Sequence, residues 1–203
     1  MKINRLVNIW ATVIHLSDAY FCNASKENSP DLGLLISEQL QIKTHNKQIW
    51  MIDAFYQDPG STGILLRNSY QTIRDSKESY LILLTPGFAD IVYKVPIRFI
   101  KRQLVQAYKR GKVFNKRVIT AFLGIPSKCP QDISKEIKRL NKTIEHVARQ
   151  YRGTIADLQN ISYELWSKRG SRPKRLDEAA KYIAEAILNC HPSVELWKKI
   201  HDK

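Results

Sequence analysis

Cysteine is scarce in this chain, with three residues among 203, at positions Cys22, Cys129 and Cys190. The number is odd, and no pair has the CxxC or other short spacing of a metal site. We therefore expect free thiols in a reduced, cytoplasmic setting, and we expect no metal site and no cofactor.

Long apolar runs are also missing. A membrane-spanning helix needs roughly 20 consecutive apolar residues, and no segment approaches that length. An apolar run near the N-terminus is interrupted by Asn8, Thr12 and His15, so we interpret it as a strand of the fold and not as a signal peptide. The length fits a single domain, residues 1–203, with a short helical tail from about residue 192.

Acidic residues are few relative to basic ones. Thirty-three Lys and Arg residues accompany nineteen Asp and Glu residues, which gives a formal net charge of +14. The excess is concentrated between Lys94 and Arg152, where sixteen cations accompany three carboxylates. A solvated helix face usually mixes both signs, so a field of one sign this large indicates a polyanionic partner.

Apolar runs of strand length recur along the chain, and all but the last are followed by a helical pattern. This alternation predicts an α/β fold of three layers, αβα, with a five-stranded parallel sheet and helices on both faces. The predicted strands cover residues 8–16, 48–55, 80–85, 118–125 and 154–158.

Three of the predicted helices are defined mainly by their apolar residues. The first begins near residue 29 and buries Leu34, Leu35 and Leu40. The second follows Gly63, where glycine and serine are typical of a helix start, and the last covers residues 176–188.

The third and fourth predicted helices separate apolar from basic side chains. The third covers residues 96–109 and ends at Gly111, and the fourth begins at residue 131. The inward stripes are Ile97, Ile100, Leu104 and Ala107 in the third helix, and Ile133, Ile137, Leu140, Ile144 and Val147 in the fourth. The outward cations are Arg98, Lys101, Arg102 and Lys109 in the third, and Lys135, Lys138, Arg139, Lys142 and Arg149 in the fourth.

The segment SYLILLTPGFAD, residues 79–90, resembles a block of the SGNH (GDSL-type) hydrolases in which a strand ends in Gly-x-Asn-Asp. In that family the Asn amide helps to bind the oxyanion of the acyl intermediate. Ala89 stands at the Asn position here and has no donor to offer.

Three weaker blocks of the same family can be placed along the chain, two before this segment and one after it. The resemblance places Ser17 at the nucleophile and Gly63 at the oxyanion glycine, and it places Ser171 and Lys174 at the Asp and His of the general-base block. A protonated lysine cannot take a proton from a serine, and a serine cannot orient an imidazole. The resemblance therefore implies the family fold without the family chemistry.

The SGNH resemblance also implies a flavodoxin-like strand order, 2-1-3-4-5, which would place the third and fourth helices side by side. A degenerate fold of this kind with a basic surface is most similar to the OSK domains of Oskar, the insect germ-plasm proteins. That resemblance implies a cytoplasmic pseudoenzyme that binds mRNA, mainly in single-stranded regions, with protein partners in a ribonucleoprotein granule. The expected RNA-binding residues are Arg98, Lys101, Arg102, Lys109, Arg110, Lys128, Lys135, Lys138, Arg139, Lys142, Arg169, Arg172, Lys174 and Arg175.

Two other functions fit the same residues. One is an active esterase with displaced catalytic groups, in which Ser17 acts with His15, His146 or His191. The other is a basic surface that docks on anionic lipid or on an acidic protein. If the partner is RNA, bases could stack on exposed rings, for which the candidates are Tyr56, Tyr93, Phe114, Tyr151 and Trp166.

Overall fold

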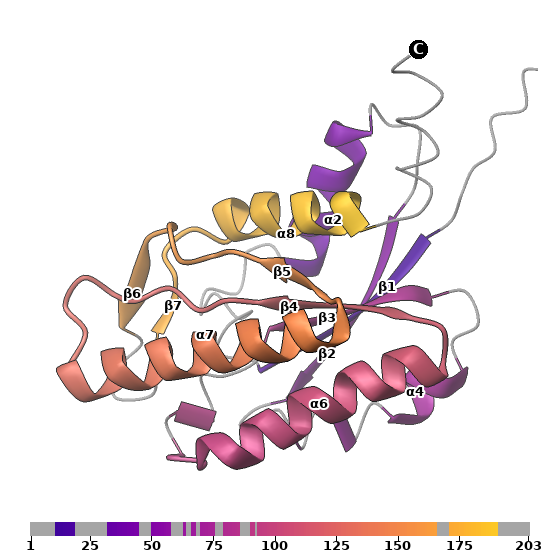
Figure 1. Ribbon diagram of the computed structural model, residues 1–203. Helices are drawn as coiled ribbons and strands as arrows, with labels where there is room; N and C mark the ends of the chain where they lie inside the picture. Colours follow the sequence, from indigo (N-terminus) through magenta and orange to yellow (C-terminus); the bar gives the residue numbers. More distant parts are fainter. Residues whose placement is uncertain are drawn as a thin grey trace, which may run out of the picture.

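Five parallel strands form the central sheet, in the order β2-β1-β3-β4-β5 (Figure 1). The computed structural model describes residues 11–18, 32–44, 50–57, 63, 66–67, 70–75, 79–85, 90–91, 93–165 and 171–190. The predicted strand order is confirmed, and each of the five predicted runs contributes one strand. The strands are β1 (Ala11–Asp18), β2 (Trp50–Gln57), β3 (Ser79–Thr85), β4 (Arg117–Ala121) and β5 (Thr154–Ala156).

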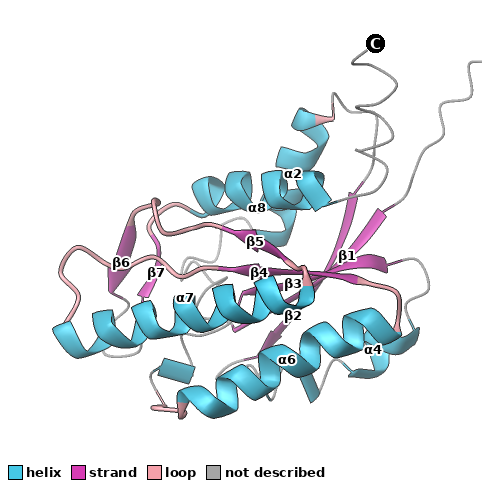
Figure 2. Cartoon of the chain, in the orientation of Figure 1, coloured by secondary structure: helices cyan, strands magenta, loops and turns pink. Residues whose placement is uncertain are grey.

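Helices cover both faces of this sheet, which confirms the predicted three layers (Figures 1 and 2). On one face, α6 (Ile97–Val113) and α7 (Gln131–Tyr151) pack side by side. On the other face, α2 (Leu32–Lys43) packs against α8 (Leu176–Cys190). The short helix α4 (Tyr70–Asp75) lies beside α6. The right-handed crossovers between neighbouring strands explain why α6 and α7 share a face.

The apolar stripes of the two basic helices form much of the core. Ile100, Leu104 and Ala107 of α6 are buried. Ile97 and Ile133, at the starts of the two helices, are only half-buried. The buried stripe of α7 consists of Ile137, Leu140, Ile144 and Val147, as predicted.

Two details of the predicted helices are wrong. Leu34 is 55% exposed, because the buried stripe of α2 runs through Leu32, Ile36 and Leu40 at intervals of four residues. Leu34 is two residues from Leu32, about 200° around the helix, and therefore faces away from the sheet.

Gly111 does not end α6, which continues to Val113. The chain turns instead at Asn115, which has a φ of 54°. Gly111 is required for close packing, since a Cβ atom there would lie 2.5 Å from Cγ2 of Val118 and 2.9 Å from the carbonyl oxygen of Lys116. The glycine therefore lets the last turns of α6 approach the start of β4.

A short antiparallel pair that the sequence did not predict lies between β5 and α8. It consists of β6 (Tyr163–Leu165) and β7 (Ser171–Pro173). Just after β7, the amide of Lys174 donates a hydrogen bond to the carbonyl of Ser162 at 2.9 Å. This hydrogen bond extends the pair by one step at its open end, where the chain enters β6 and leaves β7.

Within the described residues, no helix is long and apolar enough to cross a membrane. Cys129 and Cys190 carry free thiols, and Cys22 lies outside the described residues. Burial raises the pKa of the Cys190 thiol to about 11.

Candidate functional site

The positions that the sequence resemblance assigns to the hydrolase catalytic residues lie in different parts of the structure. Ser17 is next to the last residue of β1, where its register partners are Tyr56 of β2 and Thr85 of β3. Gly63 is helical, and a Cβ atom there would lie 3.3 Å from Cδ of Gln103 in α6. Ala89 lies outside the described residues.

The two general-base positions are in the connection that leads to α8. Ser171 is the first residue of β7, and Lys174 follows β7 with an exposed side chain. Neither residue is the histidine or the aspartate that the family uses at these positions.

The histidines that could replace the missing base are poorly placed or outside the described residues. His146 is exposed near the C-terminal end of α7, and α7 runs from the carboxyl end of β4 back to the amino end of β5. His146 therefore lies toward the amino edge of the sheet, whereas Ser17 lies at the carboxyl edge. His15 is in β1, and His191 lies outside the described residues.

The cations of α6 occupy its solvent side. This helix contains six Lys and Arg residues and no carboxylate. Arg98, Arg102 and Lys109 are exposed and lie within about 40° of one line along the helix, opposite the buried stripe. Lys101 is also exposed.

Arg110 differs from the other cations of α6, because it is half-buried and its guanidinium contacts neighbouring residues of the protein. It donates a hydrogen bond from Nη1 to the carbonyl of Leu66 at 2.8 Å, and its Cζ atom lies 4.8 Å from the ring centroid of Tyr70. The ring of Tyr70 in turn meets Phe114 edge to face. The Arg110 side chain therefore contacts α4 from α6.

The cations of α7 are exposed beside those of α6. Lys135, Lys138 and Lys142 are exposed and make no ion pair among the described residues. Arg139 is paired with Glu136 at 2.6 Å, and Arg149 is paired with Glu145 at 2.6 Å. Lys128 is exposed in the loop that precedes α7.

Among the expected RNA-binding residues in the connection to α8, Arg175 is paired with carboxylates. Arg175 contacts Asp177 and also Glu178, with Nη1 and Oε1 3.4 Å apart in the second pair. Its guanidinium lowers the pKa of the Asp177 carboxyl. Arg172 lies in β7, and Arg169 lies outside the described residues.

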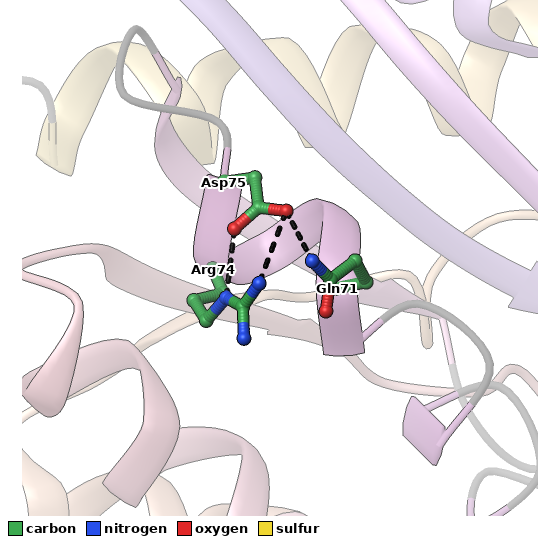
Figure 3. Close-up of polar contacts among 3 residues, drawn as sticks. All are labelled: Gln71, Arg74 and Asp75. Atoms are coloured by element: carbon green, nitrogen blue, oxygen red, sulfur yellow. Dashed lines mark hydrogen bonds and ion pairs between the residues drawn. The ribbon is translucent and has the colours of Figure 1, made fainter.

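In α4, which lies beside α6, the positive charge of Arg74 is likewise paired with a carboxylate. In Figure 3, Arg74 and Gln71 converge on the carboxylate of Asp75, with Nε of Arg74 2.7 Å from Oδ1 of Asp75. The Arg74 contact lowers the pKa of Asp75. The charge excess is therefore a property of α6 and α7 and not of every helix on this face.

A cleft of about 660 Å³ lies between the first turns of α6 and α7 and the loop that precedes α6. Ile91, Val95, Ile97, Ile133 and Leu140 contribute apolar lining. Sequence periodicity did not predict this cleft, because its lining comes from two helices and a loop that are separate in the chain. The one available signal was a pair of apolar residues, Ile97 and Ile133, in the first turns of the two basic helices. The charged residues along it are Asp90, Lys94, Arg98, Asp132, Glu136 and Arg139.

The candidate stacking rings fall into two groups. Tyr93 is 54% exposed, whereas Phe114 and Tyr151 are half-buried and Tyr151 stacks on Tyr108 in the core. Phe99, which the sequence did not single out, is 42% exposed. Tyr56 lies in β2, and Trp166 lies outside the described residues.

Several solved structures share this arrangement of sheet and helices. The acetyl xylan esterase AlAXEase is 13% identical, with a TM-score of 0.66 over 88% of this chain and 98% of that one. The fold is that of the SGNH hydrolases. A protein assigned to the lipolytic G-D-S-L family, from Desulfitobacterium hafniense, is 13% identical with a TM-score of 0.64, over 86% of this chain and 98% of that one. TesA is also 13% identical with a TM-score of 0.64, over 90% of this chain and 99% of that one.

Sequence comparison adds no closer relative. No family profile matches the chain, and no curated protein matches it. Identities this low establish the SGNH fold alone, so the function has to be argued from the residues of this chain.

Proposed function

We propose that this chain is a catalytically inactive SGNH-like domain that binds RNA through α6 and α7. The observation that carries the proposal is the charge of α6, which has six cations and no carboxylate and packs directly beside α7. Cations gathered on one surface neutralise phosphates and release counterions, which gives affinity that depends little on sequence. In this proposal mRNA is the partner, as in the OSK domains of Oskar, within a cytoplasmic ribonucleoprotein granule.

The dimensions of the surface favour an extended polyanion over a small anion. α6 has 17 residues and α7 has 21, so they are about 25 and 31 Å long. Exposed cations are distributed along both helices, from Arg98 to Lys109 in one and from Lys135 to Arg149 in the other. A single phosphate would contact only a few of them, whereas an RNA strand can contact many at once.

A second candidate is an esterase with an altered catalytic site. It is favoured by the esterases among the structural neighbours and by Ser17 at the carboxyl end of β1. It is opposed by Ala89, which has no donor, and by Lys174 at the general-base position. We therefore place RNA binding first.

The test of RNA binding uses single charge reversals with a matched control. Fluorescence anisotropy with an unstructured 20-nucleotide RNA would be measured between about 50 and 200 mM salt. The variants Arg102→Glu, Lys109→Glu, Lys135→Glu and Lys142→Glu each change the charge by two, as does the control Lys181→Glu at an exposed position of α8. Each α6 or α7 variant should weaken binding several-fold and lower the log-log salt slope by roughly 0.7.

The control separates a local site from a general effect of charge. Lys181 lies on the opposite face of the sheet, so Lys181→Glu should leave the affinity nearly unchanged. Equal effects of all five variants would mean that only the net charge matters. A wild-type salt slope near zero would contradict electrostatic RNA binding altogether.

A further inference from the structure

The cleft between α6 and α7 continues the basic surface into the carboxyl edge of the sheet. Both helices begin there, because each follows the carboxyl end of a parallel strand. Arg98 and Arg139 belong both to the cation rows of the helices and to the cleft lining. The volume, about 660 Å³, is within the range of small-molecule sites and exceeds what a single ion would need.

The lining combines apolar surface with both signs of charge. Ile91, Val95 and Ile133 are half-buried, so they offer apolar area that is not fully covered. Asp132 and Glu136 place carboxylates in the same cleft. Carboxylates repel phosphate, so the cleft is unsuited to the RNA backbone itself. They do accept hydrogen bonds from amino groups, as Asp and Glu do from N4 of cytosine.

Aromatic contact holds one of the cations at the cleft. The Cζ atom of Arg98 lies 5.2 Å from the ring centroid of Phe99, which is 42% exposed. Tyr93, 54% exposed, directly precedes Lys94 in the loop that lines the cleft. Guanidinium planes and exposed rings are the surfaces on which unpaired bases stack.

We propose that this cleft takes one unpaired base of the RNA strand that lies on α6 and α7. This inference rests on the proposed function and specifies its substrate as single-stranded RNA. The apolar side chains contact the flat face of the base, and Glu136 or Asp132 accepts a hydrogen bond from its exocyclic amino group. Arg98 and Lys94 contact the adjoining phosphates. Uracil has no exocyclic amino group, so cytosine should bind better than uracil.

The first experiment compares RNAs that differ in pairing and in base. Anisotropy would be measured for a 20-nucleotide oligo-C, an oligo-U and a blunt duplex of the same length. Wild-type protein should bind oligo-C roughly fivefold or more tightly than oligo-U. It should also prefer both single strands to the duplex. Equal affinity for oligo-C and oligo-U would overturn the assignment of the carboxylates.

The second experiment blocks the cleft. Ile133→Trp fills it from the half-buried start of α7, and Gln150→Trp places the same side chain at an exposed position near the end of that helix. Ile133→Trp should remove the preference for single strands and leave duplex binding and its salt slope unchanged. Gln150→Trp should behave as wild type. A preference that survives Ile133→Trp in a folded protein would overturn the proposal.

Glu136→Gln separates base contact from electrostatics. Removal of a negative charge from a polyanion-binding surface should strengthen binding to every RNA, and it also releases Arg139 from its ion pair. If Glu136 contacts the amino group, the ratio of oligo-C to oligo-U affinity should fall in Glu136→Gln while oligo-U binding improves. If Asp132 makes that contact, the ratio should fall in Asp132→Asn instead. An unchanged ratio in both Glu136→Gln and Asp132→Asn would contradict that contact.

Photo-crosslinking of wild-type protein keeps the proposal testable if Ile133→Trp fails to fold. RNA that contains 4-thiouridine should crosslink within residues 90–98 or 131–140. Crosslinks found only elsewhere on α6 and α7 would refute the cleft but support the RNA surface. Failure to bind oligo-C, oligo-U and duplex alike would instead refute the proposed function.

Discussion

The carboxamide of Asn141 in α7 makes two hydrogen bonds to the backbone of Leu123, just after β4. Its Oδ1 accepts from the Leu123 amide at 2.9 Å, and its Nδ2 donates to the Leu123 carbonyl at 2.7 Å. Asn141 is only 6% exposed, so an apolar side chain at this position would leave two buried backbone groups of Leu123 without partners. We expect Asn141→Leu to lower the free energy of unfolding by about 2–4 kcal/mol, measured by urea denaturation.

Gln150→Leu is the control for this prediction, because Gln150 is exposed on the same helix. It should change the free energy of unfolding by less than about 0.5 kcal/mol. A similar small change in Asn141→Leu would show that water satisfies the Leu123 groups.

Close packing predicts that a substitution to alanine destabilises the protein more at Gly124 than at Gly63. A Cβ atom at Gly124 would lie 2.0 Å from Cε2 of Tyr163, and the buried ring has no room to move. At Gly63 the nearest atom, Cδ of Gln103, would be 3.3 Å away on a flexible side chain. Gly124→Ala should therefore destabilise the protein by about 2 kcal/mol or more, and Gly63→Ala by much less. Equal thermal midpoints of the two variants would contradict this packing.

Two buried tyrosines should respond oppositely to loss of the hydroxyl. The Tyr108 hydroxyl is 2.9 Å from Oγ1 of Thr120, whereas the Tyr163 hydroxyl has no hydrogen-bond partner in the described chain. The Gly124 backbone lies close enough to affect the Tyr163 pKa but lacks the geometry of a hydrogen bond. Burial raises both pKa values, that of Tyr108 to about 12, so both rings are neutral at pH 7.

Denaturation of the two phenylalanine variants tests this difference. Tyr108→Phe should cost about 0.5–1.5 kcal/mol, because one hydrogen bond is lost. Tyr163→Phe should be neutral or stabilising, because it removes an unpaired buried hydroxyl. A clear loss of stability in Tyr163→Phe would reveal a partner for that hydroxyl.

Hydrolysis of short-chain aryl esters should be absent. Ala89 cannot donate to an oxyanion, and removal of one such donor costs about two to three orders of magnitude in rate. Ser171 and Lys174 cannot provide the base. Wild-type protein and Ser17→Ala should give the same background rate. Turnover by wild type that disappears in Ser17→Ala would establish the esterase instead.

The sheet could be predicted because helices cover both of its faces (Figure 1). Strands covered on both faces consist of apolar runs, and the SGNH resemblance supplied their order. The pair β6 and β7 could not be predicted, since each strand has three residues and β7, Ser171–Pro173, is polar and contains a proline. Gly111 was misinterpreted because a glycine near a helix end fits a cap and a close contact equally well.

The candidate site was predictable only in part. Helical periodicity correctly placed Arg98, Arg102, Lys135 and Lys142 on the solvent side. It could not show that Arg110 packs against Tyr70, because that contact joins residues 40 positions apart in the chain. The cleft is lined by residues 90–100 and 132–140, and no local sequence pattern shows that these two segments meet.

Two cationic helices that pack against each other also oppose the folding of the free protein. Their mutual repulsion is present in the compact state and largely relieved in the unfolded chain. Dissolved salt screens that repulsion, so the melting temperature of the free protein should rise between about 50 and 500 mM KCl. Added RNA should raise the melting temperature most at low salt, where it supplies the missing counter-charge. The nucleic acid would then act as a folding ligand whose benefit declines as simple ions replace it.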